Sequence, residues 1–164
     1  MALHEGRPPF SVVDVDADAI EWIERYLSLS PELSPQCDIA IERLNLARRR
    51  HSPGNRAIEG AISLEALLGP DGNQEITYRL RLRAALLLST NFEERREISN
   101  AVKEFYKPRS NTVHGIPAQP RDLHKNDACA ARGLDICSQV LRKIVSLNKP
   151  FVPEDWELSG GQPL

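Results

Sequence analysis

The sequence has no apolar run long enough to cross a membrane, and no signal-peptide pattern follows Met1. It also lacks the glycine-rich phosphate-binding motif G-x-G-x-x-G and the P-loop. Only three cysteines occur, Cys37, Cys129 and Cys137, and they form no C-x-x-C pair, which argues against a disulfide framework and a zinc cluster. These absences predict a cytoplasmic protein that needs no membrane, metal or cofactor.

The chain has little net charge, −2 at pH 7, which argues against a protein that simply coats nucleic acid. Its charges are nevertheless distributed unevenly. Residues 1–42 contain nine acidic and two basic residues, a balance of −7, whereas residues 43–164 contain fourteen acidic and nineteen basic residues, a balance of +5. Such asymmetry can steer a polyanion towards one surface, although solvated helix faces show the same pattern.

Proline, by contrast, is plentiful. Twelve prolines divide the 164 residues into long proline-free segments. Helices are expected there, because proline inside a helix removes a hydrogen bond and clashes with the preceding turn. Candidate N-caps are Asp14, Asp16, Asp18, Ser34, Asn55 and Asn91. The expected helices cover about 14–30, 34–50, 58–68, 76–88, 92–107 and 121–148.

Residues 76–83 alternate apolar and polar side chains, which is the period of a strand. The pattern nevertheless continues without a turn into an Ala- and Leu-rich run, its residues are strong helix formers, and no partner strand is evident. We therefore predict a helix. The basic run 48–51 is interpreted as a helix C-terminus, where cations oppose the dipole, in preference to an RNA contact.

The buried stripes predict an all-α fold, a bundle of about five helices in one domain at 13–148, with an irregular arm at 1–12 and a tail at 149–164. Trp22 and Tyr26 are interpreted as packing residues rather than a ligand cage. Cys129 and Cys137, eight residues apart near one helix face, are interpreted as small buried hydrophobic residues. Glu65 lies within an apolar run, so we expect it to be partly buried with an arginine as its partner.

The segment from Tyr106 to Gly115 carries the candidate chemistry. We expect the preceding helix to end at Pro108, which places Arg109 and His114 in a loop. Cleavage of RNA requires a base for the 2′-hydroxyl, an acid for the leaving oxygen and a cation on the phosphorane. His114 can serve as base or acid, and Arg109 offers a permanently charged fork for phosphate oxygens. Ser110, Asn111 and Thr112 add neutral donors between them.

Geometry limits this hypothesis. Five helical steps of about 100° would leave Arg109 and His114 roughly 140° apart, so they converge more easily outside a helix. One histidine per chain also cannot be base and acid at once, whereas a two-fold dimer would supply a second. The alternative is that Arg109 pairs with a carboxylate such as Glu65 while His114 bonds to loop carbonyls. A metal site drawn from His114, His124 and Asp122 is the weaker alternative, since no recognised ligand spacing is present.

Three features occur in order: the run Leu-Glu-x-Leu-Leu at 64–68, an arginine- and alanine-rich helix, and Tyr-x-x-Arg-Ser-x-x-Val-His-Gly at 106–115. Together they resemble the HEPN superfamily (higher eukaryotes and prokaryotes nucleotide-binding domain), nearest its ApeA-like branch. The resemblance covers about the middle third of the chain. Arg109 and His114 match the arginine and histidine of the family motif. Ser110 follows the arginine, where the family more often has Asn, Asp or His.

The resemblance implies a helical bundle that forms a homodimer and a metal-independent ribonuclease of a toxin–antitoxin or other defence system. It implies RNA as a partner, with an antitoxin or another defence protein as a further one. Arg109 and His114 would be catalytic, and Ser110 or Asn111 would orient phosphate or sugar. Tyr106 would stack on a base or support the segment, with Glu65 supporting it from the preceding motif. Some relatives are non-catalytic RNA-binding or scaffold modules, which is the alternative.

Overall fold

The structure is a computed structural model that describes residues 16–69, 75–116 and 122–149, together with residues 152, 155, 158 and 159. Six helices occur in these parts, and no strand, which confirms the all-α class. The arm predicted at 1–12 and most of the tail predicted at 149–164 lie outside the described residues. The helices are α1 (Ala17–Leu27), α2 (Ser34–Arg49), α3 (Pro53–Leu68), α4 (Ile76–Leu88), α5 (Phe92–Val113) and α6 (Leu123–Leu147).

Local signals account for several of the helix ends. Asp16 caps α1, its carboxylate accepting a hydrogen bond from the Ala19 amide at 2.8 Å. Asn91 caps α5 by accepting from the amides of Glu93 and Glu94. Two predicted caps are wrong. Ser34 is the first residue of α2, after Leu33 as the N-cap. The cap of α3 is Ser52 and not Asn55, because proline at the first position of α3 starts the helix earlier.

The helix predicted over 76–88 is confirmed as α4. Its Arg83 is only 2% exposed, yet its Nη1 donates to the Leu68 carbonyl at the end of α3, at 2.8 Å. The last carbonyls of a helix lack intrahelical partners, so this arginine caps α3 from the neighbouring helix. The basic run after residue 47 also lies as predicted: Arg48 and Arg49 occupy the last turn of α2.

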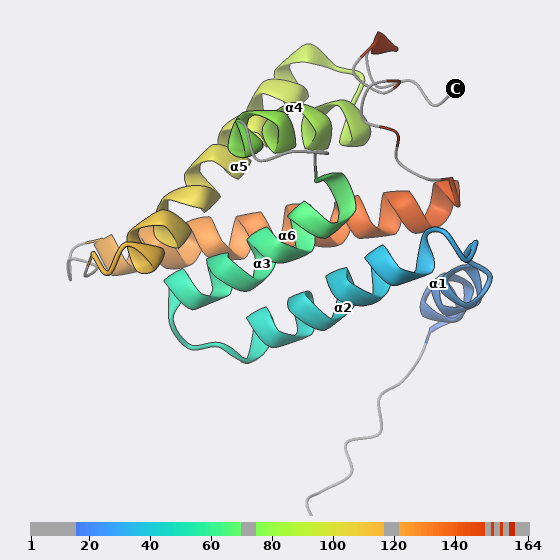
Figure 1. The fold of residues 1–164 in the computed structure, drawn as a ribbon, viewed down its shortest axis with the longest axis horizontal. Coiled ribbons are helices and arrows are strands. Elements are labelled where there is room, and N and C mark those ends of the chain that lie inside the picture. Colours follow the sequence, from blue (N-terminus) through green and yellow to red (C-terminus); the bar gives the residue numbers. More distant parts are fainter. Residues whose placement is uncertain are drawn as a thin grey trace, which may run out of the picture.

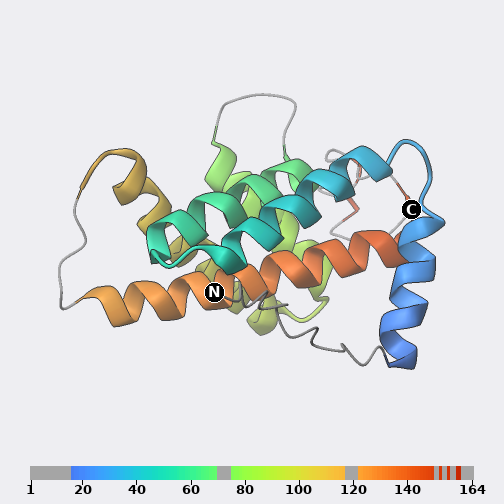
Figure 2. The ribbon, with the colours of Figure 1, turned by 90° about the horizontal axis from the view of Figure 1, so that it is seen from below.

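Helices α2 and α3 form an antiparallel pair that lies along α6, while α4 and α5 form a second pair on the other side of α3 and α6 (Figure 1). α1 lies across the end of this arrangement, near the start of α2 and the end of α6 (Figure 2). Asn148, just after α6, bonds to the segment between α1 and α2: its side chain accepts from the Ser30 amide and donates to the Ser28 carbonyl. None of the described helices combines the length and hydrophobicity needed to span a membrane.

The helices α3, α5 and α6 approach one another closely at Phe105. A methyl group on Gly60 of α3 would lie 2.7 Å from the Phe105 Cζ, and one on Gly133 of α6 would lie 2.0 Å from its Cδ2. The ring therefore fits between two glycines on neighbouring helices. Cys137 also approaches α3 here, with its Sγ 3.3 Å from the Gly60 carbonyl oxygen. The predicted burial is confirmed for Cys137, whereas Cys129 is only half-buried, and all three cysteines are free thiols.

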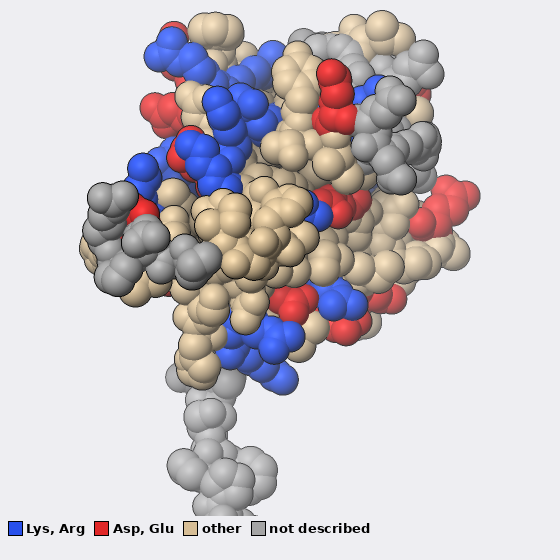
Figure 3. Space-filling model, turned by 60° about the vertical axis from the view of Figure 1, so that its left-hand side comes forward, with Lys and Arg blue, Asp and Glu red and all other residues tan. Residues whose placement is uncertain are grey.

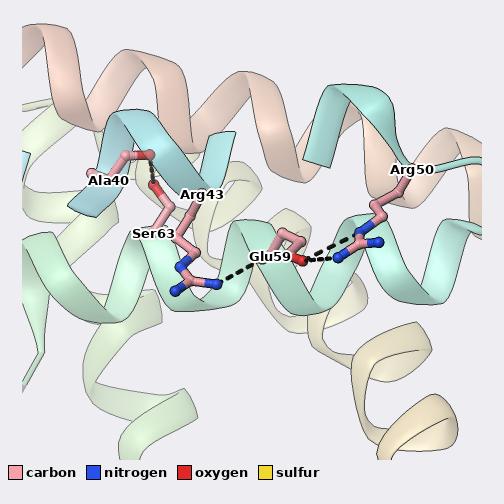
Figure 4. Close-up of polar contacts among 5 residues, drawn as sticks. All are labelled: Ala40, Arg43, Arg50, Glu59 and Ser63. Atoms are coloured by element: carbon pink, nitrogen blue, oxygen red, sulfur yellow. Dashed lines mark hydrogen bonds and ion pairs between the residues drawn. The ribbon is translucent and has the colours of Figure 1, made fainter. Parts of the chain in front are cut away.

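Polar contacts join α2 to α3. The Glu59 side chain is buried and lies between Arg43 and Arg50, with its Oε2 3.3 Å from Arg43 Nη1 and its Oε1 2.9 Å from Arg50 Nη2 (Figure 4). At the same interface between α2 and α3, the buried Ser63 hydroxyl donates to the Ala40 carbonyl at 3.2 Å. A carboxylate at this depth needs compensation, which Arg43 of α2 and Arg50, the residue that follows α2, supply.

Candidate functional site at the end of helix α5

The helix α5 continues through Pro108, so the prediction that it ends there is wrong, and Arg109 lies in a helix and not in a loop. Proline in a helix interior costs about 3 kcal/mol. Packing around it outweighs this cost, because Pro108 is itself buried and burying Phe105 and Tyr106 in the preceding turn contributes roughly 1.5–3 kcal/mol each. After the proline, Thr112 donates from its Oγ1 to the Pro108 carbonyl at 2.8 Å.

Gly115 ends the helix. Its φ of +67° is left-handed, which glycine adopts without the strain of a side chain. The Gly115 amide bonds to the Thr112 carbonyl at 3.1 Å, and the Ile116 amide bonds to the Asn111 carbonyl at 2.8 Å. This pair of bonds is the Schellman motif, with His114 as the C-cap residue. His114 and Gly115 of the Tyr106–Gly115 segment therefore both belong to the same helix terminus.

Helical geometry directs Arg109 and His114 away from each other. Five residues along a helix turn the side-chain direction through about 500°, which leaves the two side chains roughly 140° apart. Arg109 lies towards α3 with one third of its side chain exposed, whereas His114 is exposed at the helix end. The two residues therefore do not line a single site within one chain.

Arg109 has a defined environment on its inner side. Its Nη2 lies 3.4 Å from the Glu65 Oε1 on α3, and its guanidinium carbon lies 5.4 Å from the centre of the Tyr106 ring. Tyr106 is buried and donates from its hydroxyl to the same Glu65 oxygen at 3.2 Å. Burial first, and then the Glu65 carboxylate, raise the pKa of the Tyr106 phenol well above its ordinary range, so it remains a donor.

This cluster bears on three sequence predictions. Glu65 is partly buried with an arginine partner, as predicted. That partner is Arg109, so the alternative in which Arg109 pairs with a carboxylate such as Glu65 is also confirmed. Tyr106 is only 5% exposed, which leaves no face for a stacked base and makes support of Arg109 its role in this structure. The remaining motif side chains, Ser110, Asn111 and His114, are exposed.

The sequence does not reveal how closely α3 approaches the Tyr106–Gly115 segment. A methyl group on Gly54 would lie 1.8 Å from the Thr112 Oγ1, so the start of α3 contacts the last turns of α5. Beside this contact, a hollow of about 230 Å³ opens between the ends of α3, α5 and α6, and Asn111 lines it. The Pro53-Gly54 pair was the available signal, but the pair is equally typical of a turn.

Charge on this side of the molecule is mixed. Lys and Arg gather on the upper part of the face in Figure 3, with Asp and Glu between them. Two ion pairs lie along α5: Lys107 with Glu104 at 2.6 Å, and Arg96 with Glu93 at 2.9 Å. The hydrogen bond from Lys107 lowers the pKa of the Glu104 carboxyl. An approaching polyanion would therefore meet cations that are partly neutralised.

Comparison with protein-family models, with curated proteins and with solved structures found no match. Among the described residues, no group of three or more His, Cys, Asp or Glu side chains is arranged to hold a metal ion, and this includes His114, His124 and Asp122.

Proposed function

We propose that the chain is a metal-independent endoribonuclease of HEPN type, acting in a toxin–antitoxin or phage-defence context. The observation that carries the proposal is the segment Tyr-x-x-Arg-Ser-x-x-Val-His-Gly at 106–115. Its Ser110, Asn111 and His114 side chains are exposed together at the end of α5, next to a partly exposed Arg109.

Arg109 would bind and stabilise the scissile phosphate. Its contact with Glu65 is a single ion pair at 3.4 Å, and a guanidinium has five N–H donors. Glu65 and Tyr106 hold the inner side of the guanidinium, so the outer donors keep a fixed direction for a phosphate oxygen. In this arrangement Glu65 and Tyr106 are positioning residues.

In the proposed reaction His114 accepts the proton of the 2′-hydroxyl as the 2′ oxygen attacks the adjacent phosphorus. The bond from phosphorus to the 5′ oxygen breaks, and a second, protonated histidine donates a proton to that leaving oxygen. The products are a 2′,3′-cyclic phosphate and a 5′-hydroxyl, with no metal required. Ser110 or Asn111 would orient the phosphate or the sugar.

The divergence of Arg109 and His114 makes this proposal one about a homodimer. Two α5 ends related by a two-fold axis would bring the His114 side chains of both chains to one groove. Each histidine would then supply what the other lacks, one acting as base and one as acid. The exposure of His114 is what such a shared groove requires.

The test is cleavage of single-stranded RNA in EDTA by the wild type, Arg109→Ala and His114→Ala. The wild type is expected to leave 2′,3′-cyclic ends, and each variant to lose at least about a hundredfold in rate, the usual weight of an acid–base group. His124→Ala, which removes an exposed histidine outside the motif, is the matched control and is expected to retain activity. Cleavage that persists in both motif variants would refute the proposal, as would a monomer in sedimentation.

The second candidate is a non-catalytic HEPN-like module that binds RNA or serves as a dimerising scaffold. The ion pair between Arg109 and Glu65 favours it, because a neutralised arginine binds phosphate less strongly. This candidate predicts a dimer without cleavage, and RNA or protein binding that His114→Ala leaves unchanged. Binding measured on the same variants by fluorescence anisotropy separates the two candidates.

A further inference from the structure

A second hollow lies far from the α5 terminus in sequence, between α1, α2 and α6. Its volume is about 310 Å³, within the range of small-molecule sites. Ile41 and Leu44 of α2 and Leu141 of α6 supply its apolar part. Leu44 and Leu141 are each 5% exposed and belong to the main core, so this part of the wall is rigid.

The polar part of the wall is made mostly of hydrogen-bond donors. Arg48 from α2 and Arg142 from α6 both line the hollow, and no carboxylate does. Within the parts of the chain that the structure describes, neither arginine has an ion pair or a hydrogen bond. Two like charges facing one hollow repel each other, and an anion between them would relieve that repulsion.

Trp22 of α1 adds an aromatic ring to the wall. Its Nε1 is buried, and no hydrogen-bond partner for it is found among the described residues. The indole ring stacks on Tyr26 at 5.8 Å between ring centres, which confirms the predicted packing of this pair. The Asn45 amide lines the same hollow. The Ser138 hydroxyl lines it too and donates to the Leu134 carbonyl at 3.0 Å. The two guanidinium groups can only donate, so they select for an acceptor.

Two acids lie in an adjoining hollow that shares Trp22 and Arg142. Asp18 and Glu21 of α1 line that hollow. The Glu21 carboxylate is already paired with Arg25 at 2.6 Å, and no ion pair joins either acid to Arg142 in the described residues. These acids lower the positive potential around Arg142 without occupying its donors.

We propose that the hollow between α1, α2 and α6 binds a small organic anion that has an apolar body and one phosphate or carboxylate head. Arg48 and Arg142 would hold the head, because a guanidinium fork matches two oxygens of either group. The body would lie on Leu44 and Leu141. At roughly 30 Å³ for each water-sized group, a hollow of 310 Å³ takes a ligand of about ten non-hydrogen atoms.

Binding would have a structural consequence for α1. This helix has no buried residue, whereas α2 and α6 each contribute several to the core. A ligand in contact with Trp22, Arg48 and Arg142 would therefore link α1 to the rest of the bundle. The amide protons of α1 would exchange more slowly in the complex, because a ligand that binds while α1 is packed against α2 and α6 stabilises that packing.

The fluorescence of Trp22 provides the test. The chain has only two tryptophans, so Trp156→Phe leaves Trp22 as the single reporter. In this background we would titrate the full chain with phenyl phosphate and with benzoate, using phenol and inorganic phosphate as body-only and head-only controls. We expect a saturable fluorescence change and slower amide exchange in α1 with at least one of the two anions. The tighter of the two identifies the head group.

Substitution of the arginines locates the ligand. Arg48→Gln and Arg142→Gln should each weaken binding about tenfold, the order of one charge-assisted hydrogen bond. Arg49→Gln removes the neighbouring charge, which does not line the hollow, and should leave the affinity unchanged. The proposal is overturned if neither anion saturates the signal by 10 mM, roughly the weakest specific affinity worth assigning. It is equally overturned if both arginine variants bind as well as Arg49→Gln, or if phenol or inorganic phosphate binds as tightly as the anions.

Discussion

Replacing Gly133 by alanine sets two opposing effects against each other inside α6. In an unconstrained helix interior, alanine is more favourable than glycine by about 0.8–1.0 kcal/mol. At this position, however, the new methyl carbon would lie 2.0 Å from Cδ2 and 2.2 Å from Cγ of Phe105. Carbon atoms pack best about 3.5–4.0 Å apart, so these atoms would have to separate by roughly 1.5 Å.

Phe105 has little room to move. Its side chain is 1% exposed, and the overlap involves the base of the ring, which cannot rotate away. Gly60 confines the ring on its other side. Overpacking of this kind costs about 1–3 kcal/mol and sometimes more. Steric overlap should therefore exceed the helix-propensity gain, leaving Gly133→Ala about 2 kcal/mol less stable than the wild type, with Tm lower by about 4–8 °C for a chain of this size.

Urea unfolding followed by circular dichroism measures the effect. Ala131→Gly, at an exposed position two residues away in α6, calibrates helix propensity alone and should cost about 1 kcal/mol. In a Phe105→Ala background the overlapping ring atoms are absent, so Gly133→Ala should instead stabilise the protein by about 1 kcal/mol, a coupling of about 3 kcal/mol. A Gly133→Ala protein that is more stable than the wild type would refute the packing described around Phe105.

Three further predictions concern other parts of the chain. Glu59→Gln leaves Arg43 and Arg50 without their charge partner. Because both arginines are one third to one half exposed, the free energy of unfolding in urea should fall by about 2 kcal/mol, between the values for surface and buried pairs. The loss should be smaller in 1 M salt. Gly115→Ala meets no atom within 4 Å, so only its left-handed backbone should matter, a loss of about 1 kcal/mol that D-alanine at the same position would avoid. Burial raises the pKa of Cys37 to about 11 and that of Cys137 to about 12, whereas in the unfolded chain both thiols ionise near 8.5. The free energy of unfolding should therefore be level below pH 8 and fall between about pH 9 and 11, because only the unfolded chain loses these protons there. The fall should be steeper in the wild type than in Cys37→Ala.

Features with a local cause were predictable from the sequence. Asn91 caps α5 because its side chain reaches amides two and three residues ahead, and nothing distant enters that choice. The helical state of α4 follows from the propensities of Arg, Leu and Ala, despite an alternating pattern. The arginine partner of Glu65 followed from the cost of burying a carboxylate, and Arg109 was named for it in the alternative to the catalytic hypothesis.

Features with a tertiary cause were not predictable in this way. The local penalty of Pro108 is visible in the sequence, but the burial of Phe105 and Tyr106 that outweighs it arises from α3 and α6. The same holds for Gly60 and Gly133, which look like weak points in their helices until the ring between them is placed. In the candidate site, this error changed the geometry: a loop would have allowed Arg109 and His114 to converge, and the helix separates them.

That separation ties the proposed chemistry to the oligomeric state. If Arg109 and His114 lay in a loop, one chain could form a partial site, and weak cleavage by a monomer would be understandable. In a helix closed by the Gly115 terminus, the backbone directs the His114 side chain about 140° around the axis from that of Arg109. Neither residue can then reach a phosphate held by the other without a second α5 end. Loosening the terminus with Gly115→Ala should therefore reduce RNA cleavage by far more than its roughly 1 kcal/mol cost in stability, because it disturbs the register of both histidines at once. A nuclease whose rate is indifferent to this substitution would have its site elsewhere.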